Sequence, residues 1–173
     1  MTKRGEAITD RLLCEQPDAA DAGDYRRLFG SPEIGEWLRP PPLDPATAEV
    51  IDRRLFRDRA DWDEYGFGPW VLRERESGDF VGRAGLAWIM IEGGPMVELP
   101  WAVLPDHQGR GYATEAALAA VGTARDLELD RVVSLALRDN RASLRVMEKA
   151  GLTMVGEVRH AGLPHLLYEL RLS

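Results

Sequence analysis

The sequence of 173 residues contains only one cysteine, Cys14, which excludes an internal disulfide bond. It also has no apolar run long enough to span a membrane, and its first residues lead into none of the length that a signal peptide needs. These absences favour a protein of the reducing cytoplasm that has no membrane partner.

Positive charge is scarce relative to negative charge. The sequence has 22 Lys and Arg residues against 29 Asp and Glu residues, a formal net charge of -7. General binding to nucleic acid needs a basic surface, so no nucleic-acid partner is expected. An acidic surface tolerates a cationic ligand such as an amine, although charge alone selects no particular one.

Motifs for two common kinds of ligand site are missing as well. His107, His160 and His165 show no metal-ligand spacing, and no Cys/His cluster exists, so no metal is expected. The sequence also lacks G-x-x-x-x-G-K-[ST], which excludes a P-loop.

What is present fits a single domain spanning residues 1–173, without repeats or linkers. Its 45% hydrophobic and 29% charged residues are ordinary for a soluble globular protein. The patterns predict strands at about residues 8–15, 69–74, 80–90, 97–103, 131–137, 155–159 and 166–172. They predict helices at about residues 17–30, 31–38, 44–61, 113–127 and 140–151. This order indicates a mixed α/β fold with one parallel crossover.

Two features of the middle strands are informative. Pro100 interrupts the strand at 97–103, and proline cannot donate to a strand ladder. That strand is therefore predicted to be an edge, or to lose its partner on one side at Pro100. Gly82 and Gly85 within the strand at 80–90 indicate a bulge or a close backbone approach.

A glycine-rich segment, Gln108–Ala113, follows the strand at 97–103 and opens a helix. Glycines let backbone N–H groups approach an anion, and a helix N-terminus adds partial positive charge, so a pyrophosphate is a natural guest. A glycine turn without any ligand is the alternative. A dinucleotide fingerprint is weak, because Thr114 stands where its third glycine belongs.

These residues resemble the GNAT superfamily of acetyltransferases. Its signature [QR]-x-x-G-x-[GA] is matched by Gln108, Gly111 and Ala113, and the run 97–116 is similar to the branch that contains ribosomal-protein N-terminal acetyltransferases. Further likeness lies at Asn140–Ser143 with Met147–Leu152, and at Thr9–Leu13.

The resemblance implies a mostly antiparallel central sheet, flanked by helices and splayed at an acetyl-CoA cleft between the strands ending near Val103 and Leu137. Acetyl-CoA is the implied co-substrate, without a metal. Backbone groups of Trp101 and Val103 would meet the pantetheine arm, and those of residues 108–114 the pyrophosphate. The cofactor contacts implied in this way are Trp101, Val103, Gln108, Gly109, Arg110, Gly111, Tyr112, Ala113, Thr114, Asn140 and Ser143.

The implied reaction is direct attack of an amine on the acetyl thioester. Glu98 is the candidate base, with a surface or salt-bridged glutamate as the alternative. Ser143 is the candidate donor to the leaving sulfur, and a backbone N–H near Ala102 or Val103 would stabilise the carbonyl oxygen. Many family members carry a Tyr acid where this sequence has Met147, so that acid is absent or replaced.

The acceptor is expected to be a small-molecule amine or a protein or peptide N-terminus, and the protein a monomer or homodimer. Residues 37–43 and 62–67 are candidates for the acceptor pocket, although core packing is the favoured role for their aromatic side chains. A non-catalytic acyl-CoA-binding regulator on the same fold is the main alternative function. A nucleotide-binding module unrelated to acetyl transfer is the third.

Overall fold

A computed structural model describes residue 3 and residues 5–173, so the expectation about the N-terminal leader falls partly outside the described residues. The strands are β1 Ala7–Ile8, β2 Leu12–Glu15, β3 Pro69–Glu74, β4 Phe80–Gly85, β5 Ala87–Ile91, β6 Gly94–Glu98, β7 Trp101–Val103, β8 Arg131–Ala136, β9 Thr153–His160 and β10 Leu163–Arg171. The helices are α1 Ala22–Phe29, α2 Pro32–Leu38, α3 Ala48–Tyr65, α4 Tyr112–Asp126 and α5 Arg141–Lys149, with short 3-10 turns η1 Ala19–Asp21 and η2 Pro105–His107.

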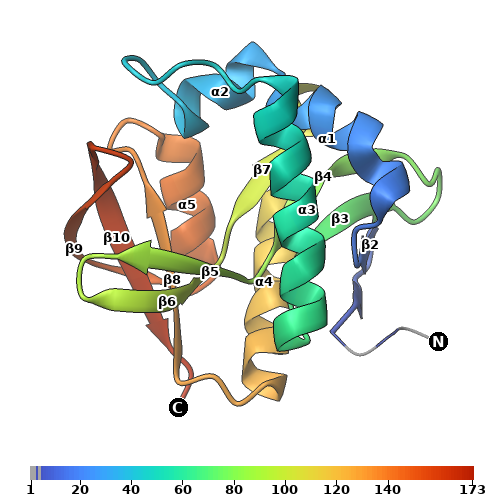
Figure 1. The fold of residues 1–173 in the computed structure, drawn as a ribbon. Coiled ribbons are helices and arrows are strands. Elements are labelled where there is room, and N and C mark those ends of the chain that lie inside the picture. Colours follow the sequence, from blue (N-terminus) through green and yellow to red (C-terminus); the bar gives the residue numbers. More distant parts are fainter. Residues whose placement is uncertain (1–2, 4) are drawn as a thin grey trace.

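The strands form two five-stranded sheets, in the orders β1-β2-β3-β4-β7 and β5-β6-β8-β10-β9 (Figure 1). All pairings are antiparallel except that of β6 with β8. The chain passes from the first sheet to the second between β4 and β5, and returns between β6 and β7. The predicted mixed, mostly antiparallel α/β class is confirmed.

The single strand expected at 80–90 is wrong, because Gly85 divides it between the sheets. Gly85 has a φ of 136°, and a Cβ there would lie 2.9 Å from the carbonyl oxygen of Gly68. A Cβ on Gly82 would overlap the carbonyl oxygen of Ala102 on β7. The predicted close backbone approach is thus confirmed at both glycines.

The loss of a strand partner at Pro100 is also confirmed. β6 pairs with β8 at Glu98 and Val133, and the N–H of Leu99 still donates to the carbonyl of Val133 at 2.8 Å. Beyond Pro100 the chain continues as β7, which pairs with β4 instead. The sheets therefore diverge between β7 and β8.

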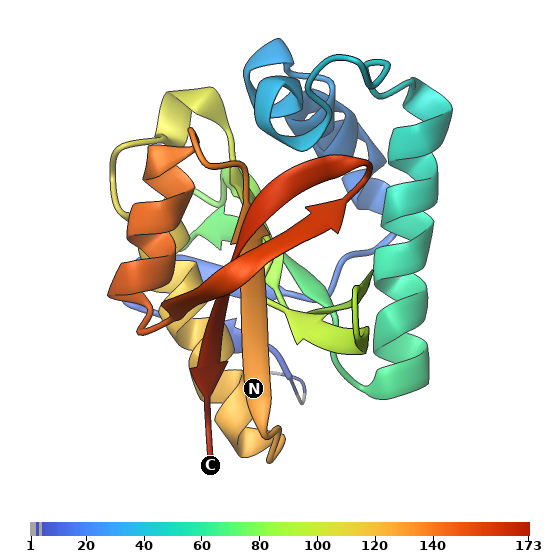
Figure 2. The same cartoon turned by 90° about the vertical axis from the view of Figure 1, so that its left-hand side faces the viewer.

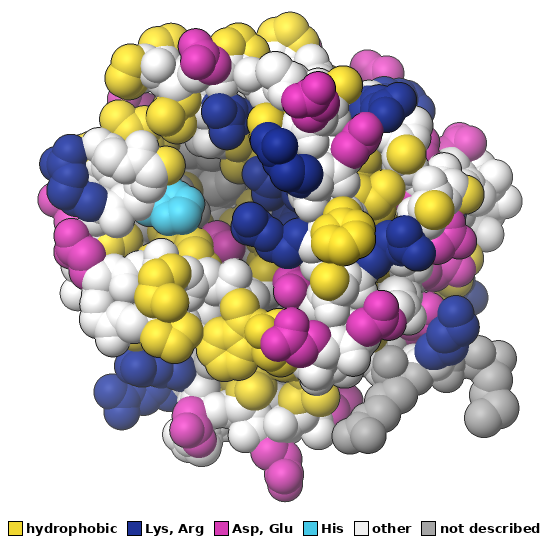
Figure 3. Space-filling view, in the orientation of Figure 1, with side chains coloured by type: hydrophobic (Ala, Val, Ile, Leu, Met, Phe, Trp, Pro, Cys, Tyr) yellow, Lys and Arg dark blue, Asp and Glu magenta, His cyan; other side chains and the backbone are white. Residues whose placement is uncertain are grey.

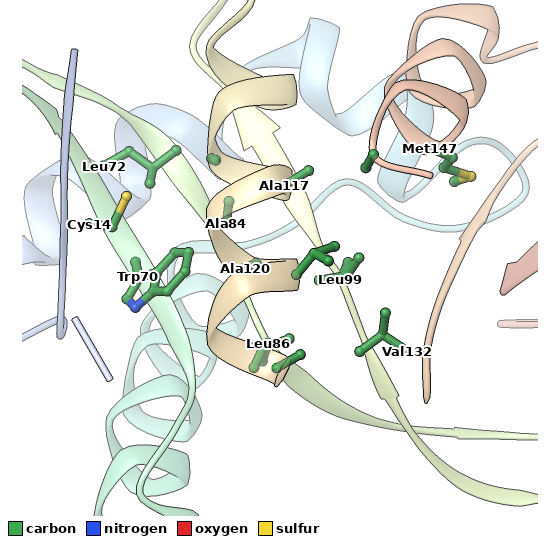
Figure 4. Packing of buried hydrophobic residues seen from close by; sticks show 14 of the residues in the cluster. Cys14, Trp70, Leu72, Ala84, Leu86, Leu99, Ala117, Ala120, Val132 and Met147 are labelled. Atoms are coloured by element: carbon green, nitrogen blue, oxygen red, sulfur yellow. The ribbon is translucent and has the colours of Figure 1, made fainter. Parts of the chain in front are cut away.

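Helices cover both faces of the first sheet (Figures 1 and 2). In Figure 2, α3 and α5 stand on opposite sides of the molecule, and the β9–β10 hairpin crosses between them. A smaller apolar cluster joins α1, α2 and α3 to residues of β3, β4 and β7. In the larger core α4 and α5 pack against residues of both sheets, and the small residues Ala117 and Ala120 let α4 approach Leu99 (Figure 4).

The predicted bounds of α3 are wrong by a few residues at each end. Asp44 and Pro45 precede the helix, and Thr47 is the N-cap, with its side chain accepting a bond from the N–H of Val50 at 3.3 Å. The helix ends at Gly66, whose φ of 73° makes a left-handed C-cap. Among the described residues, no helix has the length and apolarity to cross a membrane.

Candidate active site

A cavity of about 450 Å³ opens where the sheets diverge. Its floor includes Trp101 and Ala102 of β7, together with Ser134 to Ala136 at the end of β8 and the following Leu137. Its walls come from α3, β5, the start of α5 and the tip of the β9–β10 hairpin. A volume in this range suits a small molecule or the reactive end of a larger one.

The main chain of β7 presents alternate residues to the gap. Leu104 donates its N–H to Val81 of β4 at 2.8 Å, and antiparallel bonding repeats every second residue. The N–H and carbonyl of Ala102 therefore point towards β4, and those of Trp101 and Val103 point away from it, towards β8. The proposal of Ala102 as an oxyanion donor is thus wrong, whereas Val103 keeps a suitable orientation.

The glycine loop, residues 108–113, joins η2 to α4. Gly109 and Gly111 have φ values of 75° and 82°, in the left-handed region that favours glycine. Gly111 is the N-cap and offers no side-chain acceptor. The helical bonding begins with the N–H of Glu115 donating to Gly111, so the helix itself provides no acceptor for the N–H groups of residues 112–114. Such a terminus favours an anion.

Gln108 fastens this loop to β7. Its side-chain Nε2 donates to the carbonyl oxygen of Val103 at 3.0 Å, and its backbone N–H donates to Pro105 at 3.2 Å. The N–H that was expected at the phosphate is therefore bonded within the protein. Gln108 shapes the loop, and the amides that remain for a ligand begin at Gly109.

A network that the sequence did not predict holds the loop from outside. Arg11 bonds the carboxylate of Glu115 and donates to the carbonyl of Arg110 at 2.8 Å, with its guanidinium 4.5 Å from the ring centre of Tyr112. The hydroxyl of Tyr112 donates to Glu74 on β3. These contacts fix the start of α4 against the first sheet.

Ser143 and Asn140 meet the cavity at the start of α5. Asn140 is the N-cap of α5, and its Oδ1 accepts from the N–H of Ser143 at 3.3 Å. The indole N–H of Trp101 donates to Ser143 Oγ at 3.2 Å. Since Ser143 Oγ accepts that bond, its own hydrogen is left to donate to a ligand.

Glu98, the last residue of β6, is half-buried and lines the same cavity. Burial raises the pKa of its carboxyl to about 7, although the nearby charges of Arg83 and Arg54 act in the opposite direction. No ion pair to Glu98 exists among the described residues. A carboxylate with a pKa near neutrality has the proton affinity that a general base needs.

An ion pair lies beneath this wall of the cavity. Arg83 on β4 binds Asp58 on α3 through two bonds, of 2.6 and 2.7 Å, and Tyr25 donates its hydroxyl to the same carboxylate at 2.6 Å. Burial lowers the pKa of Arg83, but its Coulomb attraction to Asp58 and its hydrogen bonds outweigh that effect and raise it. This pair connects α3 to the strand beside β7.

The comparison with known families agrees with this geometry. Residues 11–153 match the model of the acetyltransferase (GNAT) domain. The chain belongs to the GNAT acetyltransferase family. Among solved structures, a GNAT-family acetyltransferase from Bordetella pertussis, described as putative, is 31% identical with a TM-score of 0.81, covering 96% of this chain and 99% of that one.

Two further similar proteins also have acetyltransferase in their names. The uncharacterised N-acetyltransferase YjdG of Bacillus subtilis is 29% identical over 137 residues, which is 78% of each chain. The Salmonella typhimurium protein yncA, described as a putative acetyltransferase and solved with its cofactor acetyl-CoA, is 20% identical, with a TM-score of 0.69 and 94% coverage of each chain. At that identity it speaks for the GNAT fold alone.

In this GNAT chain Met147 lies in the core, with 1% of its surface exposed, so it offers no proton donor (Figure 4). Of the segments expected at the acceptor pocket, Trp37, Leu38 and Arg39 line the cavity, whereas Trp62 and Phe67 are buried core residues outside it. The position of the α3 arginines on the cavity wall was not predicted, although their spacing of three and four residues is visible in the sequence.

Proposed function

We propose that this chain transfers an acetyl group from acetyl-CoA to an amine, by direct attack within a ternary complex. The observation that carries the proposal is the gap between β7 and β8, which has Glu98 on one wall and the glycine loop beyond its end. The acetyl-CoA bound to the neighbour yncA supports the choice of co-substrate.

The residues present fit acetyl-CoA. Trp101 and Val103 offer main-chain groups along the gap, as an added strand would require. The N–H groups of residues 109–114 suit the pyrophosphate, because Gly111 leaves the first turn of α4 uncapped. When bound, acetyl-CoA would supply an activated acetyl thioester.

Three groups of the protein would then act on the reaction. Glu98 would accept a proton from the attacking amine, directly or through water. The N–H of Val103 would stabilise the negative charge that develops on the acetyl oxygen. The hydroxyl of Ser143 would donate to the departing sulfur, with its orientation set by the indole N–H of Trp101.

Release of free thiol over a panel of amines tests the proposal, together with calorimetry of acetyl-CoA, CoA, ATP and NAD. We expect acetyl-CoA and CoA to bind and at least one class of amine to be acetylated. If acetyl-CoA binds but every amine leaves it unconsumed, the chain is an acyl-CoA-binding regulator instead. If only ATP or NAD binds, the assignment of the co-substrate is wrong.

Replacing Gly109 with Ala should weaken acetyl-CoA binding roughly tenfold, because reorienting one loop amide removes a charge-assisted bond. Gly78→Ala, in the turn between β3 and β4, is the matched control. Both glycines have left-handed φ values, of 75° and 77°, and a Cβ at either meets no atom within 4 Å. Each variant should lose roughly 1–2 kcal/mol of stability from backbone strain. Equal acetyl-CoA affinities in the two would contradict a role of this loop in binding.

Cys14 should contribute almost nothing to the thiol-release signal. Burial of the thiol is the largest effect, and together with the negative charges of Glu115 and Glu15 it raises the pKa of Cys14 to about 12. At pH 8 its thiolate fraction is then roughly a thousandfold below that of an exposed cysteine. Ellman's reagent should therefore react very slowly with the native protein, and with one thiol after denaturation. Fast reaction of the native protein would show that Cys14 is accessible.

A further inference from the structure

One face of α3 forms a wall of the cavity and carries an unusual set of charges. The residues of this face recur at intervals of three or four along α3, so they project from one side of the helix. The residues of this face are Val50, Arg53, Arg54, Arg57, Asp58 and Asp61, and all six line the cavity.

The cavity is basic although the protein is acidic. Five arginines and three carboxylates line it, whereas the whole chain carries a net charge of -7. Arg83 and Asp58 neutralise one another in their buried pair. Arginine side chains gather along α3 beside a hollow in the surface (Figure 3).

The three arginines that α3 contributes to the cavity lack a carboxylate partner in the described part of the chain, as does Arg39, which donates to the backbone carbonyl of Asp44 instead. Within residue 3 and residues 5–173, Arg53, Arg54 and Arg57 form no ion pair. Arg54 is held in place, with its guanidinium 4.6 Å from the ring centre of Phe29. Burial, followed by the charge of Arg83, lowers the pKa of Arg54 to about 10, so it remains charged at neutral pH. A partly buried cation without a partner favours an anionic ligand.

The position of these arginines separates them from the expected cofactor phosphates. No residue of the glycine loop lines this cavity. Glu98 does line it, and is near enough to Arg54 for each to influence the pKa of the other. An amine presented to Glu98 would therefore have its neighbouring atoms close to the arginine face.

We propose that the acceptor is a small amine that also carries a carboxylate or a phosphate, and that Arg53, Arg54 and Arg57 bind this oxyanion. The inference rests on the proposed acetyl transfer and specifies its second substrate. The cavity volume of about 450 Å³, which must also admit the acetyl end of the co-substrate, favours a molecule of amino-acid size. Guanidinium groups bind carboxylates and phosphates through paired hydrogen bonds.

Matched acceptors test the charge requirement. L-amino acids would be compared with their carboxamides, and phosphoethanolamine with ethanolamine, in the thiol-release assay. We expect the anionic member of the reactive pair to have a kcat/KM at least roughly tenfold higher, the size of one charge-assisted bond. The pair that reacts identifies the oxyanion as a carboxylate or a phosphate.

Arg57→Gln tests the arginine face, with Arg59→Gln as the matched control. Both residues are exposed on α3, but only Arg57 lines the cavity. Arg57→Gln should lower kcat/KM for the anionic acceptor roughly tenfold and leave that for its neutral counterpart unchanged. Arg59→Gln should change neither, and the dissociation constant of acetyl-CoA should stay the same in both variants.

The outcomes distinguish this inference from the function on which it rests. Equal rates for anionic and neutral acceptors, or a loss of acetyl-CoA affinity in Arg57→Gln, would overturn the anionic acceptor while acetyl transfer stands. Acetylation of peptides alone would overturn the small-molecule assignment. If no amine is acetylated, acetyl transfer fails, and calorimetry of the same acceptor pairs on the CoA-loaded protein still decides for or against an oxyanion site.

Discussion

Replacing Glu98 with Gln is expected to lower kcat by roughly a hundredfold or more, the usual contribution of a general base. The variant keeps the size and hydrogen-bonding capacity of the side chain but cannot take a proton. Since Glu98 lies on the cavity wall and not in the glycine loop, the dissociation constant of acetyl-CoA should remain unchanged. Steady-state kinetics and calorimetry measure the two quantities.

The pH profile gives an independent readout. With a pKa of about 7, Glu98 is protonated and inactive as a base below that pH, so kcat/KM of the native protein should rise as the pH passes through 7. Glu98→Gln should lose this inflection and keep only the rise that follows deprotonation of the amine itself. Glu92→Gln, in the exposed turn after β5, is the control and should behave as the native protein. An unchanged rate in Glu98→Gln would remove this residue from the mechanism.

Replacing Asp58 with Ala is expected to lower the free energy of unfolding by roughly 3–5 kcal/mol, because it leaves a buried guanidinium without a counter-charge. The side chains of Arg83 and Asp58 are only 7% and 2% exposed. The change also removes the acceptor of the Tyr25 hydroxyl. Chemical denaturation followed by circular dichroism measures the loss.

The same helix supplies the control for this stability effect. Asp52 on α3 forms a similar two-bond pair with Arg26, at 2.9 and 2.6 Å, but these side chains are 44% and 54% exposed. Asp52→Ala should therefore cost far less than Asp58→Ala. The double change Asp58→Ala with Arg83→Leu should recover part of the loss, because it removes the stranded charge. Equal losses at Asp52 and Asp58 would show that burial of the pair has no energetic consequence.

The parts of the fold that were predictable depend on local chemistry. Proline lacks an N–H, so Pro100 alone indicates where the strand leaves β8. The division of the strand at 80–90 was not predictable, since it depends on where the backbones of Gly68 and Ala102 lie relative to Gly85 and Gly82. The start of α3 was misplaced because Asp44 and Thr47 both have side chains that can cap a helix, and packing decides between them.

The candidate site also has some parts that the sequence indicates and others that depend on the folded structure. The glycine loop is one contiguous motif, so the sequence indicates its place before a helix, and the anion that it would bind stays a prediction. Glu98 was singled out from its place on the strand, but the burial that raises its pKa arises only in the folded molecule. The ion pair of Arg83 and Asp58 joins residues that are 25 positions apart, so no local sequence pattern indicates it. The arginine face of α3 did have a pattern in the sequence. The spacing of its residues indicates one face of a helix, but it does not indicate that this face lines a cavity.

The arginine face has a practical consequence for redesign. Its residues precede β7 in the chain, whereas the glycine loop follows β7, so the two lie on separate elements. Exchanging side chains at positions 50, 53 and 57 would change the charge of the cavity wall and leave the glycine loop unchanged. Under the proposed role of this face, we expect changes on a single helix to alter which amine the protein accepts.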